Sequence, residues 1–374
     1  MDTKTQHGYL VIADISGFTS YLAKVELEHA HEILTDLLET IVKELKTLLI
    51  ICKLEGDAVF AYVSEANTPG GERILELIEN TYIAFRRQRE TSQRNTTCTC
   101  KACQSIPTLD LKFFVHHGDF IVQEVSGIRE LVGSDVNVLH RLVKNHITEI
   151  TGWKAYILFT NQALQHMDVQ PEGLHQQVES YEHLGDIQVL CLDLHERYKA
   201  IMTAKRVIVS PEEADLIFSI ELPAPTPVAW HYLTDPGKKS KAFNGFAIFT
   251  PKSRPGGRSG PGASNHCAHG KDYQGSTIET FLDWRPFEYL TVESVEGKMV
   301  LRETYRFEPS IDGRETRLQV FTQIVSMPLP RWLKRLFIKL FVAQKLTFPY
   351  YALAQLIAKE SVSETIDASA QPVT

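Results

Sequence analysis

The sequence has little that would insert the chain into a membrane or crosslink it with disulfides. No run of about 18 apolar residues occurs, so no transmembrane segment is expected. The N-terminus, MDTKTQHGYL, lacks the basic and then apolar pattern of a signal peptide. Six cysteines among 374 residues are too few for a disulfide framework. Together these absences predict a protein of the reducing cytoplasm.

The sequence also has fewer basic residues than acidic ones. The chain has 39 Lys and Arg against 46 Asp and Glu, a net charge of −7. Binding to nucleic acid without sequence preference requires a basic face, so no nucleic-acid partner is expected. A chain of 374 residues is too long for one ordinary hydrophobic core, so two domains are expected, at residues 1–200 and 210–365.

The first half of the chain alternates strand and helix patterns. GYLVIADIS predicts a buried strand, and apolar residues at steps of three and four between positions 30 and 48 predict a long helix. LLIICKLEGDAVFAYV predicts two strands joined at Gly56 and Asp57, and a second helix follows over about 71–87. LDLKFFVHHGDFIVQEV predicts a further hairpin that turns at Gly118 and Asp119, before a third helix near residue 136. This order predicts a ferredoxin-like α+β layer.

Two acidic residues lie at the end of one predicted strand and in the turn between the next two. Asp14 follows the first strand and Asp57 lies in the first hairpin turn, so the two carboxylates are expected at one edge of the sheet. Such a pair suits one or two hard cations, and Mg²⁺ held this way suits phosphoryl or nucleotidyl transfer. The backbone of Gly17, Phe18 and Thr19, which leads into a helix, is a candidate for binding phosphate oxygens. Acids that simply form turns remain the alternative at this point.

Four segments follow one another in a recognisable order: ADISGFTSYL, KLEGDAVFAY, VHHGDF and ELVGSDVNVLHRL. In sequence and order they resemble the class III nucleotidyl cyclase catalytic domain over roughly residues 7–165. The resemblance implies an adenylate cyclase that converts ATP to 3′,5′-cyclic AMP and pyrophosphate in signal transduction. It implies two Mg²⁺ or Mn²⁺ ions per site, held at Asp14, Ile15 and Asp57. It also implies a homodimer whose sites are shared between the two chains.

The same resemblance assigns roles to four further residues. Lys53 matches the lysine that contacts adenine, and Glu130 occupies the second base-reading position, where adenylate cyclases usually carry Asp, Thr or Ser. Glu130 can still accept a hydrogen bond from the adenine amino group, although its side chain is one methylene longer than Asp. Asn137 and Arg141 match the residues that contact the ribose and the phosphates, and a step of four places both on one helix face.

A cysteine-rich stretch, TTCTCKACQ, interrupts the cyclase-like pattern. Cys98, Cys100 and Cys103 are close enough to bind Zn²⁺ with a fourth ligand from elsewhere. A redox-sensitive pair and a reduced polar loop are the alternatives. The whole pattern resembles an uncharacterised cyclase-like group that carries such an insert.

The sequence pattern of the chain changes near residue 200. Several segments alternate apolar and polar residues as antiparallel strands do, and residues 330–360 predict a long amphipathic helix with Pro349 inside it. The layout resembles a START-like (SRPBCC, polyketide cyclase superfamily) helix-grip domain, in which an antiparallel sheet surrounds a long C-terminal helix. This resemblance implies a cavity for an apolar small molecule. The alternative to an active cyclase is therefore a catalytically degenerate nucleotide-binding module, coupled to a carrier or sensor domain.

Overall fold

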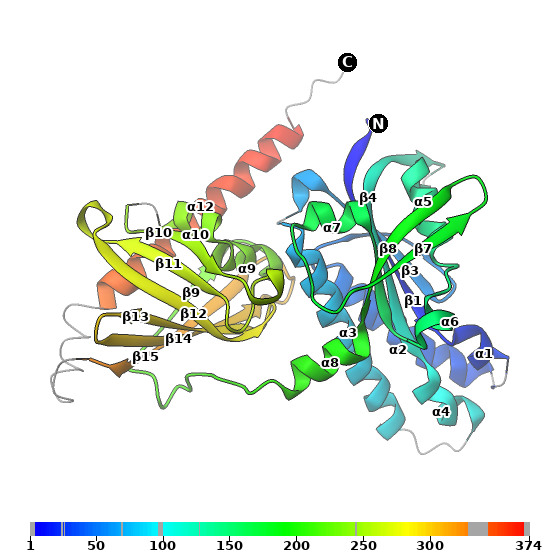
Figure 1. Cartoon of the computed structure of the whole chain (residues 1–374), viewed down its shortest axis with the longest axis horizontal. Helices are drawn as coiled ribbons and strands as arrows, with labels where there is room; N and C mark the ends of the chain where they lie inside the picture. The colour runs from blue at the N-terminus through cyan, green and yellow to red at the C-terminus, as the bar shows by residue number, and fades with distance from the viewer. Residues whose placement is uncertain are drawn as a thin grey trace. The chain divides into compact units, whose positions relative to one another are not determined.

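The computed structural model describes residues 4–23, 25, 27–68, 70–95, 100–126, 128–243, 245–327 and 343–369. The chain divides into two units, Met1–Ala204 and Lys205–Thr374, both drawn in Figure 1. Within the described residues, no helix combines the length and the hydropathy that crossing a membrane requires.

The first unit combines strands and helices along its whole length. Its elements are, in chain order, β1 (Gln6–Ser16), α1 (Phe18–Leu22), α2 (Leu27–Leu45), β2 (Ile50–Glu55), β3 (Ala58–Ser64), α3 (Glu72–Asn95), α4 (Lys101–Ser105), β4 (Asp110–Val125), β5 (Ile128–Val132), α5 (Ser134–Leu142), α6 (Ile147–Thr151), β6 (Tyr156–Thr160), α7 (Asn161–Met167), β7 (His175–Tyr181), β8 (Gly185–Asp193) and α8 (Leu194–Thr203).

The described strands of this unit form one mixed sheet in the order β2-β3-β1-β4-β6-β8-β7, and β5 pairs with β4 off this path. The β4–β6 pair is parallel, and the other pairs are antiparallel. The first part of the unit, from β1 through α2, β2, β3 and α3 to β4, has the strand order of a ferredoxin-like layer. The predicted α+β class is therefore confirmed.

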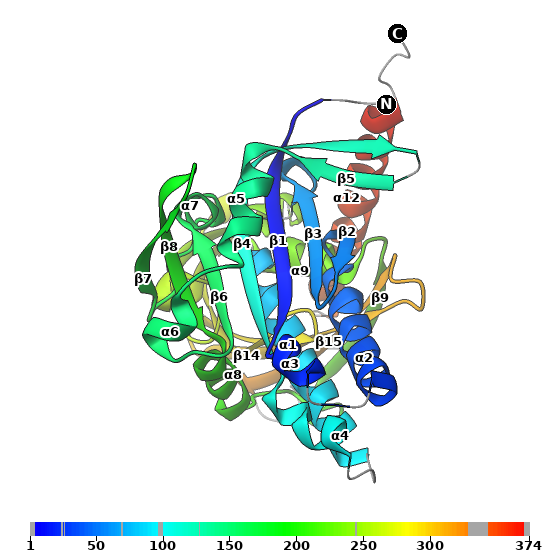
Figure 2. The same ribbon diagram turned by 90° about the vertical axis from the view of Figure 1, so that its right-hand side faces the viewer.

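Helices cover both faces of this sheet. α5 packs on one face through Val136, Leu139 and Leu142, which share a buried cluster with Leu10 and Ile12 of β1. α3 lies behind the sheet in Figure 2, on the opposite face from α5. Because alternate residues of β1 point to opposite faces, Asp14 lies on the same face as Leu10 and Ile12.

The predicted hairpin at Gly118 and Asp119 is wrong. β4 continues through both residues and pairs with β1, with Gly118 opposite Gly8. The chain reverses only after β4, near Ser126, whose φ is +54°. At Gly118 a Cβ atom would lie 2.4 Å from a carboxylate oxygen of Asp135, so this glycine serves the close approach of α5 rather than a turn.

The second unit is an antiparallel sheet with helices on it. Its strand order is β10-β11-β12-β13-β14-β15-β9 among the described residues, and α12 packs on the sheet through Tyr350, Leu353 and Ile357. Pro349 lies inside α12, and residues 330–342 of the predicted helix fall outside the described part of the chain. The elements are β9 (Leu216–Leu222), α9 (Thr226–Thr234), α10 (Pro236–Ala242), β10 (Ala247–Ser253), β11 (Ser264–His269), β12 (Gly275–Arg285), β13 (Tyr289–Glu296), β14 (Met299–Pro309), β15 (Thr316–Ser326) and α12 (Ala343–Ser369).

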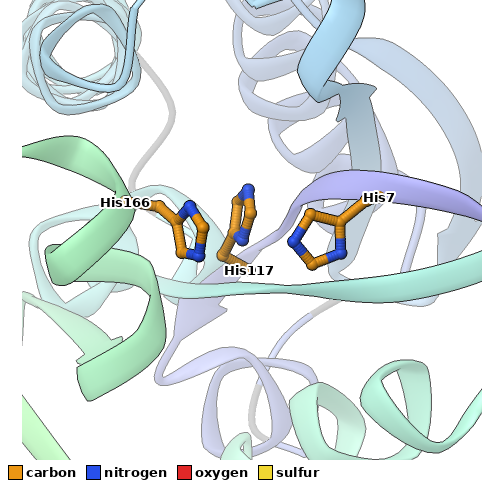
Figure 3. Close-up of side chains that lie close together, drawn as sticks. All are labelled: His7, His117 and His166. Carbon is orange, nitrogen blue, oxygen red and sulfur yellow. The ribbon is translucent and has the colours of Figure 1, made fainter.

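Near the start of β1, three histidines from separate elements lie close together. They are His7 of β1, His117 of β4 and His166 of α7, which Figure 3 shows side by side. Sequence reasoning did not single them out.

Candidate functional site

The structure brings Asp14 and Asp57 together. Asp14 lies near the end of β1, opposite Ala58, the residue that follows Asp57. The Ile15 N–H donates to the Asp57 carbonyl oxygen at 3.2 Å, which ties the end of β1 to the turn between β2 and β3. Gly56 makes this tight turn feasible because its φ is +66°, a conformation that glycine adopts without strain.

Burial disfavours the charged form of both carboxylates. Burial and, next, the nearby Asp57 raise the pKa of Asp14 to about 6, although Lys112 opposes this shift. Burial also raises the pKa of Asp57. We call Asp14 and Asp57 the acid pair. Either a bound proton or a nearby cation would offset the cost of burying their negative charge.

Lys112 is a member of this site that sequence reasoning missed. It lies directly opposite Asp14 in the pairing of β1 with β4, on the same face of the sheet. Its ammonium group also lies 5.2 Å from the centre of the Tyr156 ring. Burial lowers the pKa of Lys112, and Asp14 partly offsets that effect. The only sequence signal was a lysine within the short apolar run of residues 111–115.

The predicted phosphate-binding segment begins immediately after β1. Gly17 has a φ of +88°, and a Cβ atom there would lie 2.9 Å from the Thr108 carbonyl oxygen, so the position requires glycine. Phe18 and Thr19 open α1, and the Tyr21 N–H donates to the Gly17 carbonyl oxygen. Phe18 also lines an open groove of about 830 Å³ between α1, α2 and the β2–β3 turn.

Lys53 and Glu130, distant in sequence, form an ion pair. The Lys53 Nζ lies 2.9 Å from Glu130 on β5 and 2.7 Å from Glu55 on its own strand. Burial alone would lower the pKa of Lys53, but the hydrogen bonds to Glu55 and Glu130 outweigh it and raise the pKa. Glu55 also lies 3.6 Å from His140 of α5. These four residues form the Lys53 cluster, of which sequence reasoning missed Glu55 and His140.

Asn137 and Arg141 are both exposed on α5, on the side away from its buried apolar residues. The N-terminal end of α5 is held by Asp135. Its carboxylate accepts the backbone N–H of Asp119 at 2.7 Å and lies 3.2 Å from the buried His116.

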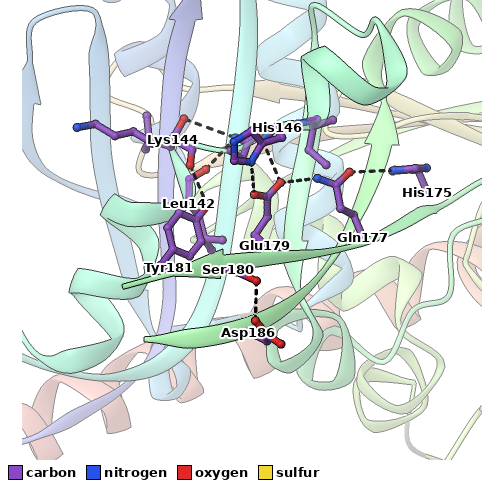
Figure 4. Close-up of polar contacts among 12 residues, drawn as sticks. Leu142, Lys144, His146, His175, Gln177, Glu179, Ser180, Tyr181 and Asp186 are labelled. Atoms are coloured by element: carbon purple, nitrogen blue, oxygen red, sulfur yellow. Dashed lines mark hydrogen bonds and ion pairs between the residues drawn. The ribbon is translucent and has the colours of Figure 1, made fainter. Parts of the chain in front are cut away.

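The other end of α5 leads into a second anchor, shown in Figure 4. The buried Glu179 of β7 accepts both the backbone N–H of His146 at 3.0 Å and a bond from its ring at 2.9 Å. The Tyr181 hydroxyl donates to the Lys144 carbonyl oxygen at 3.0 Å. Because both ends are fixed, α5 presents Asn137 and Arg141 from a rigid support.

The predicted site residues therefore fall into two groups on this unit. The acid pair and the Gly17 turn lie where β1 runs into α1. In Figure 2, α1 lies at one end of the sheet and β5 lies towards the other. The Lys53 cluster, Asn137 and Arg141 make up the second group. It approaches the acid pair at Glu55, which lies two residues before Asp57.

The cysteine insert is described only in part. Cys98 lies outside the described residues. The Cys100 sulfur caps α4 by accepting the backbone N–H of Cys103, which is buried. Zinc binding by the three cysteines stays a prediction.

The second unit contains a cavity of about 510 Å³. Aromatic side chains, including Phe243 and Phe249, line it alongside several buried polar groups. Lys239 pairs with Glu279 at 2.5 Å, and the Tyr305 hydroxyl bonds to Glu303 at 2.8 Å. A purely apolar ligand is therefore not what this lining suits best.

Comparison with known proteins gives a limited likeness. Residues 34–151 match the model of a family described as a protein of unknown function (DUF2652). The uncharacterized protein Rv2561/Rv2562 of Mycobacterium tuberculosis is 28% identical over 162 residues, which cover 43% of this chain and 73% of that protein.

Solved structures of nucleotidyl cyclases are similar at low identity. The guanylyl cyclase Cya2 matches with a TM-score of 0.42 and 13% identity, covering 51% of this chain and 93% of that one. The adenylyl cyclase CyaB from P. aeruginosa matches with a TM-score of 0.40 and 16% identity, covering 52% and 97%. At these values the likeness assigns no activity to this chain.

Proposed function

We propose that the first unit is a nucleotidyl cyclase domain that converts ATP to 3′,5′-cyclic AMP and pyrophosphate. The observation that carries the proposal is the acid pair at the end of β1, on a unit that also presents the Lys53–Glu130 ion pair and a rigid helix with Asn137 and Arg141. In the reaction the ribose 3′-oxygen attacks the α-phosphorus, the bond from that phosphorus to the bridging oxygen breaks, and the hydroxyl proton passes to water.

The acid pair fits a hard divalent cation. Its two carboxylates are adjacent and half-buried, and burial raises the pKa of both. Among the described residues, no side chain donates a hydrogen bond to Asp14. When bound, Mg²⁺ or Mn²⁺ would lower the pKa of the attacking hydroxyl and neutralise the departing pyrophosphate. Lys112 would add a fixed positive charge beside Asp14.

The remaining residues would position the nucleotide. Lys53 donates to a ring nitrogen of adenine, and Glu130 accepts from its amino group. For this the two must open their mutual ion pair, which is partly exposed and so costs little to separate. Asn137 would orient the ribose, and the Arg141 guanidinium would stabilise charge on the phosphate oxygens in the transition state.

We further propose that the working unit is a homodimer. Asn137 and Arg141 are exposed on α5, on the side away from the residues by which α5 packs on the sheet that carries the acid pair. A two-fold axis would bring the acid pair of one chain against α5 of the other and complete two sites at once.

The test is turnover by the purified full-length chain. ATP or GTP is supplied with Mg²⁺ or Mn²⁺, and cyclic nucleotide is measured by mass spectrometry. Asp14→Asn and Asp57→Asn should each abolish cyclic AMP formation, whereas Asp36→Asn, an exposed acid of α2, should not. Product that persists in both acid-pair variants would refute the cyclase proposal. Nucleotide binding without any product would favour the degenerate regulatory module.

A second function is proposed for the second unit, the binding of an amphipathic small molecule. A cavity of about 510 Å³ is within the size range of small-ligand sites, and its aromatic lining surrounds buried charged groups. The START-like resemblance would make this ligand a regulator of the cyclase.

The cavity can be tested with the fluorescent probe 8-anilinonaphthalene-1-sulfonate. Oleic acid is added as a competitor, and the probe fluorescence that it removes measures binding in the cavity. Cys267 lines the cavity, so Cys267→Trp should fill it and abolish this competed fluorescence. Ile311→Trp, in a fully exposed turn, is the matched control. Probe binding that is equal in both variants would contradict the proposal.

A further inference from the structure

Three imidazoles converge beside the start of β1, away from the acid pair. The ligand nitrogens of His7, His117 and His166 all lie within 4.8 Å of one another. The His7 and His117 ring centres are 4.4 Å apart and perpendicular, and the His117 and His166 rings stack at 3.8 Å. His7 and Asp14 are seven residues apart on one strand, which separates them by roughly 20 Å.

His117 is the buried member, with only 3% of its surface exposed. Among the described residues, neither of its ring nitrogens has a hydrogen-bond partner. An unsatisfied buried polar group typically costs about 1–3 kcal/mol, so such a side chain calls for a ligand.

His7 is oriented as a metal ligand would be. Its Nδ1 lies 2.7 Å from a carboxylate oxygen of Asp119, which leaves Nε2 to face the cluster. A carboxylate behind a histidine is the usual outer support of a metal-bound imidazole. Tetrahedral coordination by Zn²⁺ needs ligand nitrogens about 3.3 Å apart. His7 and His166 are exposed and can rotate to close the remaining gap.

We propose that His7, His117 and His166 bind a divalent transition-metal ion of the Zn²⁺ type, leaving a fourth coordination position for water. Imidazole suits Zn²⁺, Ni²⁺ and Co²⁺, whereas Mg²⁺ prefers the oxygen ligands of the acid pair. The ion would tie β1, β4 and α7 together. Because the backbone of Asp119 also holds Asp135, it would brace the strand on which α5 rests.

The experiment uses the full-length chain stripped with EDTA and titrated with Co²⁺ and then Zn²⁺. Co²⁺ should give the visible absorption of a tetrahedral nitrogen site, and Zn²⁺ should displace it and raise the thermal midpoint. Thiolate ligation at the cysteine insert would instead add the strong near-ultraviolet absorption of sulfur-to-cobalt charge transfer, which separates the two sites.

The variants are chosen at exposed positions so that folding is preserved. His7→Gln and His166→Gln should each weaken Co²⁺ binding at least tenfold and remove the Zn²⁺-induced rise in midpoint. Asp119→Asn should weaken binding roughly tenfold or more through loss of the support to His7. His31→Gln, an exposed histidine on α2, should bind as the wild type does. Unchanged affinity in both His7→Gln and His166→Gln, or only thiolate-type spectra, would overturn the proposal.

Discussion

Asp14→Asn should stabilise the metal-free protein at neutral and alkaline pH. The pKa of Asp14 is raised from 3.8 to about 6 by burial and by Asp57, so the native state holds this proton more tightly than the unfolded chain does. Stability therefore falls as the pH rises from about 4 to about 6, and the full penalty is present above that range. A shift of about two pKa units corresponds to roughly 3 kcal/mol, and asparagine removes the charge responsible.

The assay is urea unfolding of the full-length chain in EDTA, followed by circular dichroism and fitted with one transition for each unit. At pH 8 the first unit of Asp14→Asn should be more stable than the wild type by up to about 3 kcal/mol, and the difference should shrink towards zero near pH 4. Saturating Mg²⁺ should stabilise the wild type but not the variant. Asp36→Asn should behave as the wild type throughout. A variant that is no more stable at pH 8, or a difference independent of pH, would refute the reasoning.

Three further tests, each with its own variant or pair of substitutions, concern other parts of the structure. Gly118→Ala should destabilise the first unit by about 1–3 kcal/mol in urea unfolding, because the new Cβ atom would clash with the anchored Asp135 carboxylate. An unchanged urea midpoint would mean that α5 can move away from β4. Lys239→Met should lower the free energy of unfolding of the second unit by about 3–5 kcal/mol, because it leaves the buried Glu279 without its cation. The double variant with Glu279→Gln should recover most of this stability. Equal loss in the single and double variants would contradict the pairing. Lys53→Glu combined with Glu130→Cys should shift the ratio of turnover from ATP towards GTP, and an unchanged ratio would show that neither residue faces the base.

The parts of the first unit that could be predicted from sequence depend on local patterns. The Gly56 turn has a short polar signal between apolar strands, and the α5 pattern places its buried residues three apart. The proximity of Asp14 and Asp57 follows from strand order once the βαββαβ pattern is recognised.

The parts that sequence reasoning missed depend on pairing between distant segments. Gly118 and Asp119 have the composition of a turn, and only the packing of α5 against β4 shows why the glycine is there. Lys112 joins the acid pair because of the β1–β4 register. His7, His117 and His166 come from three elements with no shared spacing. In the second unit, the polar lining of the cavity comes from residues spread over several strands and helices.

The most direct test of the proposed shared site is complementation between two inactive variants. Asp57→Ala removes one half of the proposed site and Arg141→Ala removes the other, so each protein alone should form no cyclic AMP. Mixed under conditions in which the chains exchange, they should regain activity, because each heterodimer contains one intact site built from the two unaltered halves. If exchange is demonstrated by mass spectrometry and the mixture still forms no cyclic AMP, the site is not shared between two chains.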